Sequence, residues 1–327
     1  MTPTLAIVER LPGHTEAMGG FAALALELGF DTHLFYESSD PFHMIEYFRT
    51  RIPIGAENIH DWYDINNLGS HFDVIVLNTS YVWLDLGPWL QQWNAHTRII
   101  ALHHHPEDIE LNPYGASVYL TPAAGKEKWI FPLYSKPPVP QDSKLENASP
   151  SLHRATELPT LFIIGAWEGK DIAGALAYMN AGGKLVHYDR HQCYHFPANN
   201  GLYTQHVGLN GMQFMTSLAQ QKKPFFLWLP IVSPSDYMVC RFTGALTLGV
   251  EMNAIMVMPE RLRKLYGFPE PAVITYDSSV TEAECLEILG ASPVKQHERQ
   301  RQLGIWAREQ WNMNLEVFQA LLGRRNA

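Results

Sequence analysis

Residues 160–170 read TLFIIGAWEGK, a short apolar run followed at once by a glycine-rich turn and a lysine. A run of this length, made of β-branched and bulky apolar residues, is typical of a strand that is buried on both faces of a parallel sheet. A helical pattern at 171–180 and a second apolar run at 184–188 complete a strand–helix–strand unit. Such a crossover predicts a parallel sheet with helices packed on its faces.

The chain begins with the same pattern. Residues 4–8 form an apolar run, and a helical segment at 15–28 leads to a second strand at 31–36. Further strands are predicted at 72–78, 98–103, 117–120, 224–229, 254–258 and 272–276, and further helices at 85–95, 211–221, 243–250, 281–289 and 297–322. The sequence of residues 41–67 does not distinguish between helix, strand and loop. The chain therefore contains two α/β units, one in each half.

A proline-rich stretch separates the two halves. Residues 135–159 hold five prolines among serines, asparagines and charged residues. Because proline removes a backbone donor and blocks regular structure, we expect a linker here. The fold class expected is α/β, with two Rossmann-like domains that face a central cleft. We expect an N-terminal domain over 1–140, joined by a returning C-terminal helix at about 305–327, and a C-terminal domain over 155–304.

Composition narrows the class of protein. The chain has 327 residues, of which 46% are hydrophobic and 17% charged, which is enough to bury two cores. A net charge of -9 argues against a general nucleic-acid binder, which needs a basic stripe to neutralise phosphates. The three cysteines form no C-x-x-C pair, no apolar run is long enough for a transmembrane segment, and the first residues lack a secretion signal. We therefore expect a cytoplasmic protein.

Ligand-binding candidates in the first half follow predicted strands. Gly13 and His14 lie in the loop after the first strand, Trp83 lies just past the strand that ends near residue 78, and His103 and His104 end another strand. Ligands of open α/β sheets bind beyond the carboxyl ends of strands, so these five residues are candidate contacts. The imidazole of His14 could act as a general base near neutral pH. The alternative is that they belong to ordinary polar loops and packed aromatic clusters.

No metal site is expected. Neighbouring histidines in the run 103–105 point in different directions, so they do not converge on one metal. His187, His191, Cys193 and His195 are also close in sequence, but their H-x-C-x-H spacing matches no structural zinc pattern.

Two helix starts in the second half are suited to a phosphate. A lysine at a glycine-rich helix start, as in 165–170, places a cation beside free backbone N–H groups. Residues 241–244 begin another helix and add a guanidinium and a hydroxyl. Both loops lie at the same edge of the predicted sheet. The alternative for 241–244 is a capped helix with a solvated arginine. The candidate phosphate contacts are Gly165, Lys170, Arg241, Phe242, Thr243 and Gly244.

These motifs together resemble the GT-B superfamily of nucleotide-sugar glycosyltransferases. Residues 244–250 with the strand that follows are similar to the family's donor-side helix, and 165–170 to the first loop of its donor domain. Pro12, Gly13 and His14 resemble the loop in which some inverting members keep a catalytic histidine. The order of elements, the linker and the C-terminal helices extend the resemblance over nearly the whole chain.

The resemblance implies transfer of a sugar from a nucleoside diphosphate sugar to a hydroxyl of a glycan or another acceptor. The N-terminal half would bind the acceptor through Gly13, Trp83, His103 and His104, and the C-terminal half the nucleotide sugar. The chain has no D-x-D sequence, so the transfer is expected to be metal-independent, with the nucleotide sugar as co-substrate and no other cofactor.

If the reaction inverts the anomeric centre, His14 would take the acceptor proton while Lys170 and Arg241 stabilise the leaving diphosphate. A carboxylate should orient His14, and the candidates are Glu16, Asp85 and Asp108, with Asp108 taken as the catalytic partner.

Two departures from the family bear on the stereochemistry. Many retaining members carry a glutamate where this chain has Gly244, and an arginine where it has Ala166. Retaining chemistry is therefore not supported. Two alternatives remain: a nucleotide-sugar epimerase on the same architecture, and a two-lobed protein that binds a sugar or nucleotide without catalysis.

Overall fold

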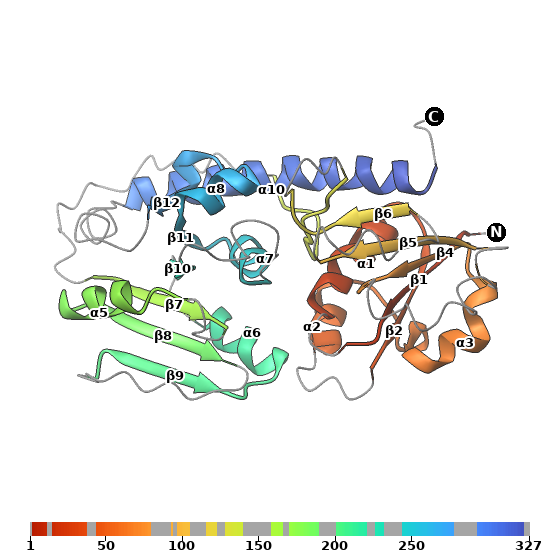
Figure 1. The fold of residues 1–327 in the computed structure, drawn as a ribbon, viewed down its shortest axis with the longest axis horizontal. Coiled ribbons are helices and arrows are strands. Elements are labelled where there is room, and N and C mark those ends of the chain that lie inside the picture. The colour runs from red at the N-terminus through yellow and green to blue at the C-terminus, as the bar shows by residue number, and fades with distance from the viewer. Residues whose placement is uncertain are drawn as a thin grey trace.

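Two six-stranded parallel sheets lie side by side and are bridged by a long C-terminal helix (Figure 1). The computed structural model describes residues 2–11, 15–37, 44–79, 93, 97–104, 116–122, 128–139, 158–165, 170–189, 201–220, 226–231, 244–277 and 293–323. The expected fold class, α/β with two Rossmann-like domains, is confirmed.

The first sheet has the order β3-β2-β1-β4-β5-β6. Leu5 and Ile7 face one apolar cluster, whereas Ala6 and Val8 face another. Successive side chains of a strand point to opposite faces, so this apolar run covers both sides of the sheet. Its strands and helices are β1 (Thr4–Glu9), α1 (Thr15–Glu27), β2 (Asp31–Tyr36), α2 (Met44–Arg51), β3 (Ile59–Asp61), α3 (Ile65–Leu68), β4 (Val74–Leu77), β5 (Arg98–His103) and β6 (Ala116–Tyr119), with short 3-10 helices at Ala56–Asn58, Trp62–Asp64 and Gly69–His71.

The second sheet has the order β12-β11-β10-β7-β8-β9. Read in chain order, each sheet places its strands as 3-2-1-4-5-6, which is the arrangement of a Rossmann sheet. The elements of this half are β7 (Thr160–Ile164), α5 (Ile172–Asn180), β8 (Lys184–Asp189), β9 (Tyr203–Val207), α6 (Gly211–Ala219), β10 (Phe226–Trp228), α7 (Gly244–Glu251), β11 (Ile255–Pro259), α8 (Glu260–Tyr266), a 3-10 helix at Glu270–Ala272 and β12 (Val273–Tyr276).

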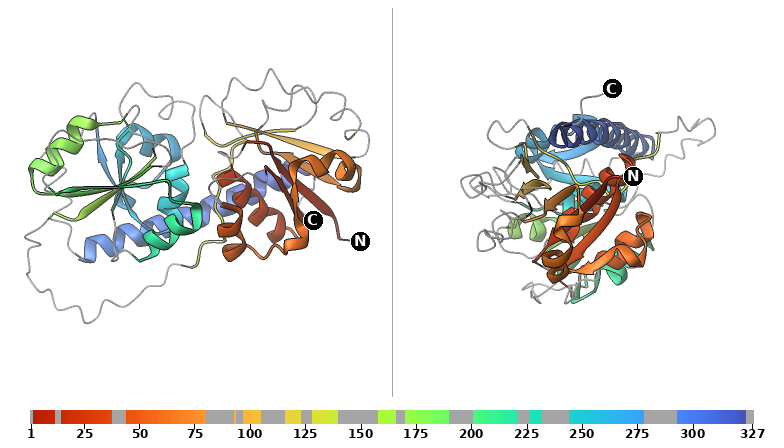
Figure 2. Two further views of the ribbon diagram at one scale, coloured as in Figure 1. Left: turned by 90° about the horizontal axis from the view of Figure 1, so that it is seen from below. Right: turned by 90° about the vertical axis from the view of Figure 1, so that its right-hand side faces the viewer.

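Helix α10 (Pro293–Leu321) runs along both halves, as the views in Figure 2 also show. At 1.5 Å per residue its 29 residues extend over about 43 Å. Near its start, Arg299 donates to the backbone oxygen of Val273 in the second half at 2.8 Å. Near its end, Phe318 packs edge-on against Phe21 of α1. One helix therefore holds the two halves together.

Most predicted elements are confirmed within a few residues, and the differences have local causes. The ambiguous stretch 41–67 contains α2 and β3, and β3 is only three residues long. Strand β9 was missed because its sequence, YTQHV, is largely polar and only its first residue is buried, as at a sheet edge. Helix α8 was also missed, and α10 begins at 293 rather than 297.

Some predictions fall outside the described residues. These are the helix at 281–289, the domain boundary between 140 and 155, and all of the helix at 85–95 except Trp93, which is buried in the first half. Within the described part of the chain, no helix combines the length and apolarity that a membrane crossing requires.

Candidate functional site

The carboxyl ends of β1, β4 and β5 meet at one edge of the first sheet, because these strands are parallel neighbours. Glu9 ends β1, Asn78 and Thr79 follow β4, and His103 ends β5, with His104 next to it. The strand order changes direction between β1 and β4. In open α/β sheets such a switch point is where ligands bind.

Glu9 accepts hydrogen bonds from several of the groups at this edge. Its carboxylate is fully buried and accepts hydrogen bonds from Thr79 Oγ1 at 2.6 Å, from the backbone N–H of Leu11 at 2.6 Å and from Asn78 Nδ2 at 2.5 Å. Burial raises the pKa of Glu9 to about 7, and the hydrogen bonds from Thr79, Leu11, Asn78 and the backbone of Arg10 oppose this rise only in part. Burial therefore disfavours the charged form of this carboxylate, and its hydrogen bonds favour it.

The two histidines at the end of β5, His103 and His104, have different surroundings. His103 is fully buried, lies within 3.1 Å of Ser117 Oγ and stacks against Tyr119. His104 is partly buried, and its Nε2 lies 2.9 Å from the backbone oxygen of Asn78. Since a carbonyl oxygen only accepts, this nitrogen of His104 must carry the proton. Of the pair, His104 reaches the surface at the carboxyl edge, and an acceptor contact by His103 stays a prediction.

In the second half, Lys170 lies beside the end of β7. Its Nζ donates to the backbone oxygens of Ile164 and Gly165, at 2.9 and 2.5 Å. Burial lowers the pKa of Lys170 to about 7, although the nearby Asp189 favours the charged form. The backbone of Gly165 has a φ of 86°, a left-handed conformation that favours glycine. The structure therefore brings these two predicted residues together.

His187 supports the same turn from the neighbouring strand β8. Its Nε2 lies 2.7 Å from the backbone oxygen of Gly165, and its Nδ1 lies 2.8 Å from the hydroxyl of Tyr203. The ring is fully buried, and burial lowers the pKa of His187 to about 4. The ring is therefore neutral at pH 7, and it fixes the end of β7 rather than offering a charge.

Helix α7 begins at Gly244 and connects the parallel strands β10 and β11, so its N-terminal end lies toward the carboxyl edge of the sheet. Seven predicted site residues lie outside the described residues: Gly13, His14, Trp83, Asp108, Arg241, Phe242 and Thr243. Their roles stay predictions. Among the residues that the structure does describe, no group of three or more candidate side chains could hold a metal ion.

The sequence alone does not identify Glu9 and His187 as buried groups at these edges. Glu9 ends an apolar run, and this charge directly after a buried strand was the available signal. His187 lies within such a run and was considered only as a zinc ligand. Their burial depends on strands that are distant in the sequence, so no local pattern reveals it.

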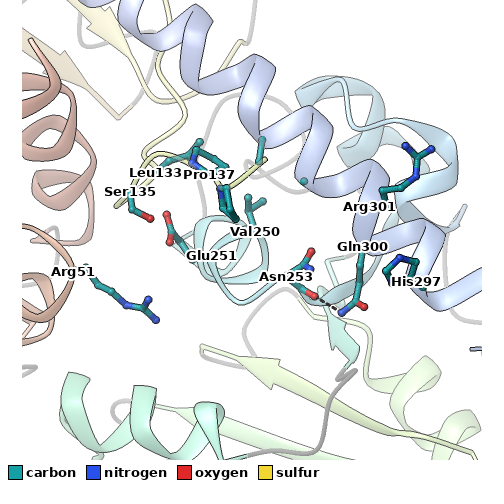
Figure 3. A pocket seen from close by; sticks show the side chains of 13 residues that line it. Arg51, Leu133, Ser135, Pro137, Val250, Glu251, Asn253, His297, Gln300 and Arg301 are labelled. Atoms are coloured by element: carbon teal, nitrogen blue, oxygen red, sulfur yellow. Dashed lines mark hydrogen bonds between the residues drawn. The ribbon is translucent and has the colours of Figure 1, made fainter. Parts of the chain in front are cut away.

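A separate cavity of about 380 Å³ lies where the two halves join (Figure 3). Its walls come from the ends of α2 and α7, from residues 133–138 and from α10. Glu251 accepts the backbone N–H of Tyr134 at 2.6 Å, and Gln300 donates to the backbone oxygen of Asn253. The C-terminal ends of α2 and α7 line this cavity. A helix that connects two parallel strands ends near the amino end of the next strand, so the cavity is distinct from the two carboxyl edges.

Solved structures share this fold over the whole chain. Neither a model of a protein family nor a curated protein sequence matches. AviGT4, a glycosyltransferase involved in avilamycin A biosynthesis, is similar over 99% of each chain, with a TM-score of 0.59 and 16% identity. A glycosyltransferase from Rickettsia africae is similar over 99% of each chain (TM-score 0.57, 10% identity), and Anabaena HepE in complex with UDP over 98% of each (TM-score 0.56, 9% identity). The GT-B fold expected from the sequence is confirmed.

Proposed function

We propose that the chain is a glycosyltransferase that moves a sugar from a nucleoside diphosphate sugar to a hydroxyl group of an acceptor. The observation that carries this proposal is the pairing of two Rossmann sheets, each with a cluster of polar groups at its carboxyl edge. Similarity over the whole chain to two solved glycosyltransferases supports it. Because fold alone does not establish activity, the assignment rests on the site residues and their tests.

In this proposal the second half binds the donor. A diphosphate would lie between the turn at Gly165, the side chain of Lys170 and the start of α7, where backbone N–H groups favour an anion. A diphosphate beside Lys170 would favour its charged form, which burial alone disfavours. The protein groups would stabilise the leaving diphosphate, so the proposed transfer does not require a metal. Anabaena HepE was solved with UDP, which makes uridine diphosphate the first nucleotide to test.

The decisive experiment is a titration of nucleoside diphosphates and nucleotide sugars by calorimetry, followed by turnover assays of each donor that binds. Formation of a glycosylated acceptor, or slow hydrolysis of the donor, supports the transferase. Conversion of the donor into its epimer without transfer supports the epimerase instead. Binding with no turnover supports a binding protein.

Arg241 is the proposed charged contact to the donor diphosphate. Arg241→Ala should weaken binding of the nucleoside diphosphate by about 1.5–3 kcal/mol, because charge-assisted hydrogen bonds are lost. The measurement is calorimetric titration with the free diphosphate. Arg261→Ala, on α8 of the same half, is the matched control and should bind normally. Unchanged affinity of Arg241→Ala would remove this residue from the site.

His14 is the proposed catalytic base, with Asp108 orienting its ring, and the reaction is proposed to invert. His14→Ala should reduce kcat about 10²–10⁴-fold while donor binding stays nearly intact. The rival bases are His103 and His104 at the end of β5, and of the two only His104 is partly exposed. A normal kcat for His14→Ala together with a low kcat for His104→Ala would move the assignment to His104. The anomeric configuration of the product, read by NMR, tests the inversion.

A further inference from the structure

We propose that Glu9 is a positioning residue for the acceptor site: its buried carboxylate joins the ends of β1 and β4 and, through Asn78, holds the ring of His104 at the end of β5. The assignment of this edge to the acceptor rests on the proposed function. The geometry behind it is independent of which sugar or nucleotide is used.

Hydrogen bonds connect these groups, and Asn78 links them through both its side chain and its backbone. One oxygen of Glu9 accepts the backbone N–H of Leu11, which fixes the start of the loop after β1. The other accepts both Asn78 Nδ2 and Thr79 Oγ1, which fixes the end of β4. The backbone oxygen of Asn78 then accepts the ring N–H of His104. Three neighbouring strand ends are thereby tied to a single carboxylate.

Glu9 acts through other residues rather than by touching a ligand. Its side chain is fully buried, and so are those of Asn78 and Thr79, whereas His104 is only partly buried. Burying a carboxylate is costly unless its oxygens are fully hydrogen-bonded. The observed donors supply these bonds, so loss of any one of them should loosen the strand ends. A displacement of about 1 Å at a reacting group can reduce a rate about 100-fold.

The first test needs no substrate. The ring N–H of His104 is protected by its bond to Asn78 and should give a slowly exchanging signal in the NMR spectrum of protein with ¹⁵N-labelled histidine, assigned with His104→Ala. Glu9→Gln replaces one acceptor oxygen by an amide donor, and Thr79→Val removes one donor at nearly constant size. Both variants should broaden or lose the signal. Thr79→Ser keeps the hydroxyl and should retain it.

Glu251→Gln is the matched control for loss of a carboxylate, because Glu251 lies at the domain junction and not at this edge. It should leave the His104 signal unchanged. If Glu9→Gln fails to fold, the Thr79→Val and Thr79→Ser pair decides the question. A His104 signal that persists in both Glu9→Gln and Thr79→Val overturns the proposal.

The second test uses a donor that the wild type turns over. Glu9→Gln and Thr79→Val should lower kcat about 10- to 100-fold, while the KM for the donor changes by no more than about twofold. Thr79→Ser should restore kcat. Normal kcat in folded Glu9→Gln contradicts positioning. A wild type that turns over no nucleotide sugar overturns the proposed function instead, and the ring signal still decides whether Glu9 holds His104.

Discussion

At the two carboxyl edges, burial shifts the pKa of Glu9, Lys170 and His187, and in each case it disfavours the charged form. The pKa of Glu9 is raised to about 7, that of Lys170 is lowered to about 7, and that of His187 is lowered to about 4. Ionisable groups with shifted pKa values are common at functional sites, because catalysis needs pKa values that burial and neighbouring charges adjust. Glu9 and Lys170 can therefore change charge near neutral pH when a ligand arrives.

The buried carboxylate of Glu9 makes stability depend on pH. Its pKa is about 7 in the folded chain and close to 4.5 when unfolded, so the folded state holds the proton more tightly. Between these values the free energy of unfolding contributed by Glu9 falls as pH rises, by roughly 3 kcal/mol in total. The side chain of Glu9→Gln does not ionise. In urea titrations between pH 5 and 8, the free energy of unfolding of this variant should therefore fall less than that of the wild type. Equal pH dependence of the two proteins contradicts the burial argument.

At the scale of elements, two glycines allow α1 to pack closely against neighbouring segments of the first half. Gly19 and Gly20 are adjacent glycines in the sequence of this helix. In the structure both lie within α1, and a Cβ at Gly20 would come within 2.6 Å of the backbone of Pro132. A Cβ at Gly19 would meet the ring of Phe48 at 2.7 Å. The glycines therefore serve contact between elements of the protein.

Gly20→Ala tests this contact, and the sign of the effect is decisive. In an isolated helix the substitution would stabilise by about 1 kcal/mol. Here it should destabilise by about 1–3 kcal/mol, because the added methyl group overlaps Pro132. Urea denaturation measures the difference. Gain of stability would show that the 128–134 segment moves away at little cost.

At the scale of the whole molecule, α10 joins the halves through a buried amide. Asn314 is fully buried, and its Oδ1 accepts the backbone N–H of Phe131 at 3.1 Å while its Nδ2 donates to the backbone oxygen of the same residue at 2.6 Å. Phe131 itself packs against Tyr266, Phe268 and Trp306. The segment that follows β6, the second half and α10 therefore share one cluster.

Asn314→Ala should lower the free energy of unfolding by about 2–4 kcal/mol, because it leaves two buried backbone groups of Phe131 without these partners. Asn312→Ala, at an exposed position of the same helix, is the matched control and should change stability by less than about 0.5 kcal/mol. Thermal and urea unfolding measure both. Equal effects of the two substitutions would show that the amide contributes nothing specific.

The sequence by itself determined the alternation of strands and helices, the two parallel sheets and the candidate turn at Gly165 and Lys170. These features are local: apolar runs, helical periodicity and a glycine at a strand end are visible within about ten neighbouring residues. Tertiary structure alone decided which groups meet. Glu9 and Thr79 are 70 residues apart, and Phe131 and Asn314 are 183 apart. Strand β9 and helix α8 likewise depend on what they pack against. Burial, hydrogen-bond partners and pKa arise from such distant pairs, so they follow from the order of the strands rather than from any local stretch of residues.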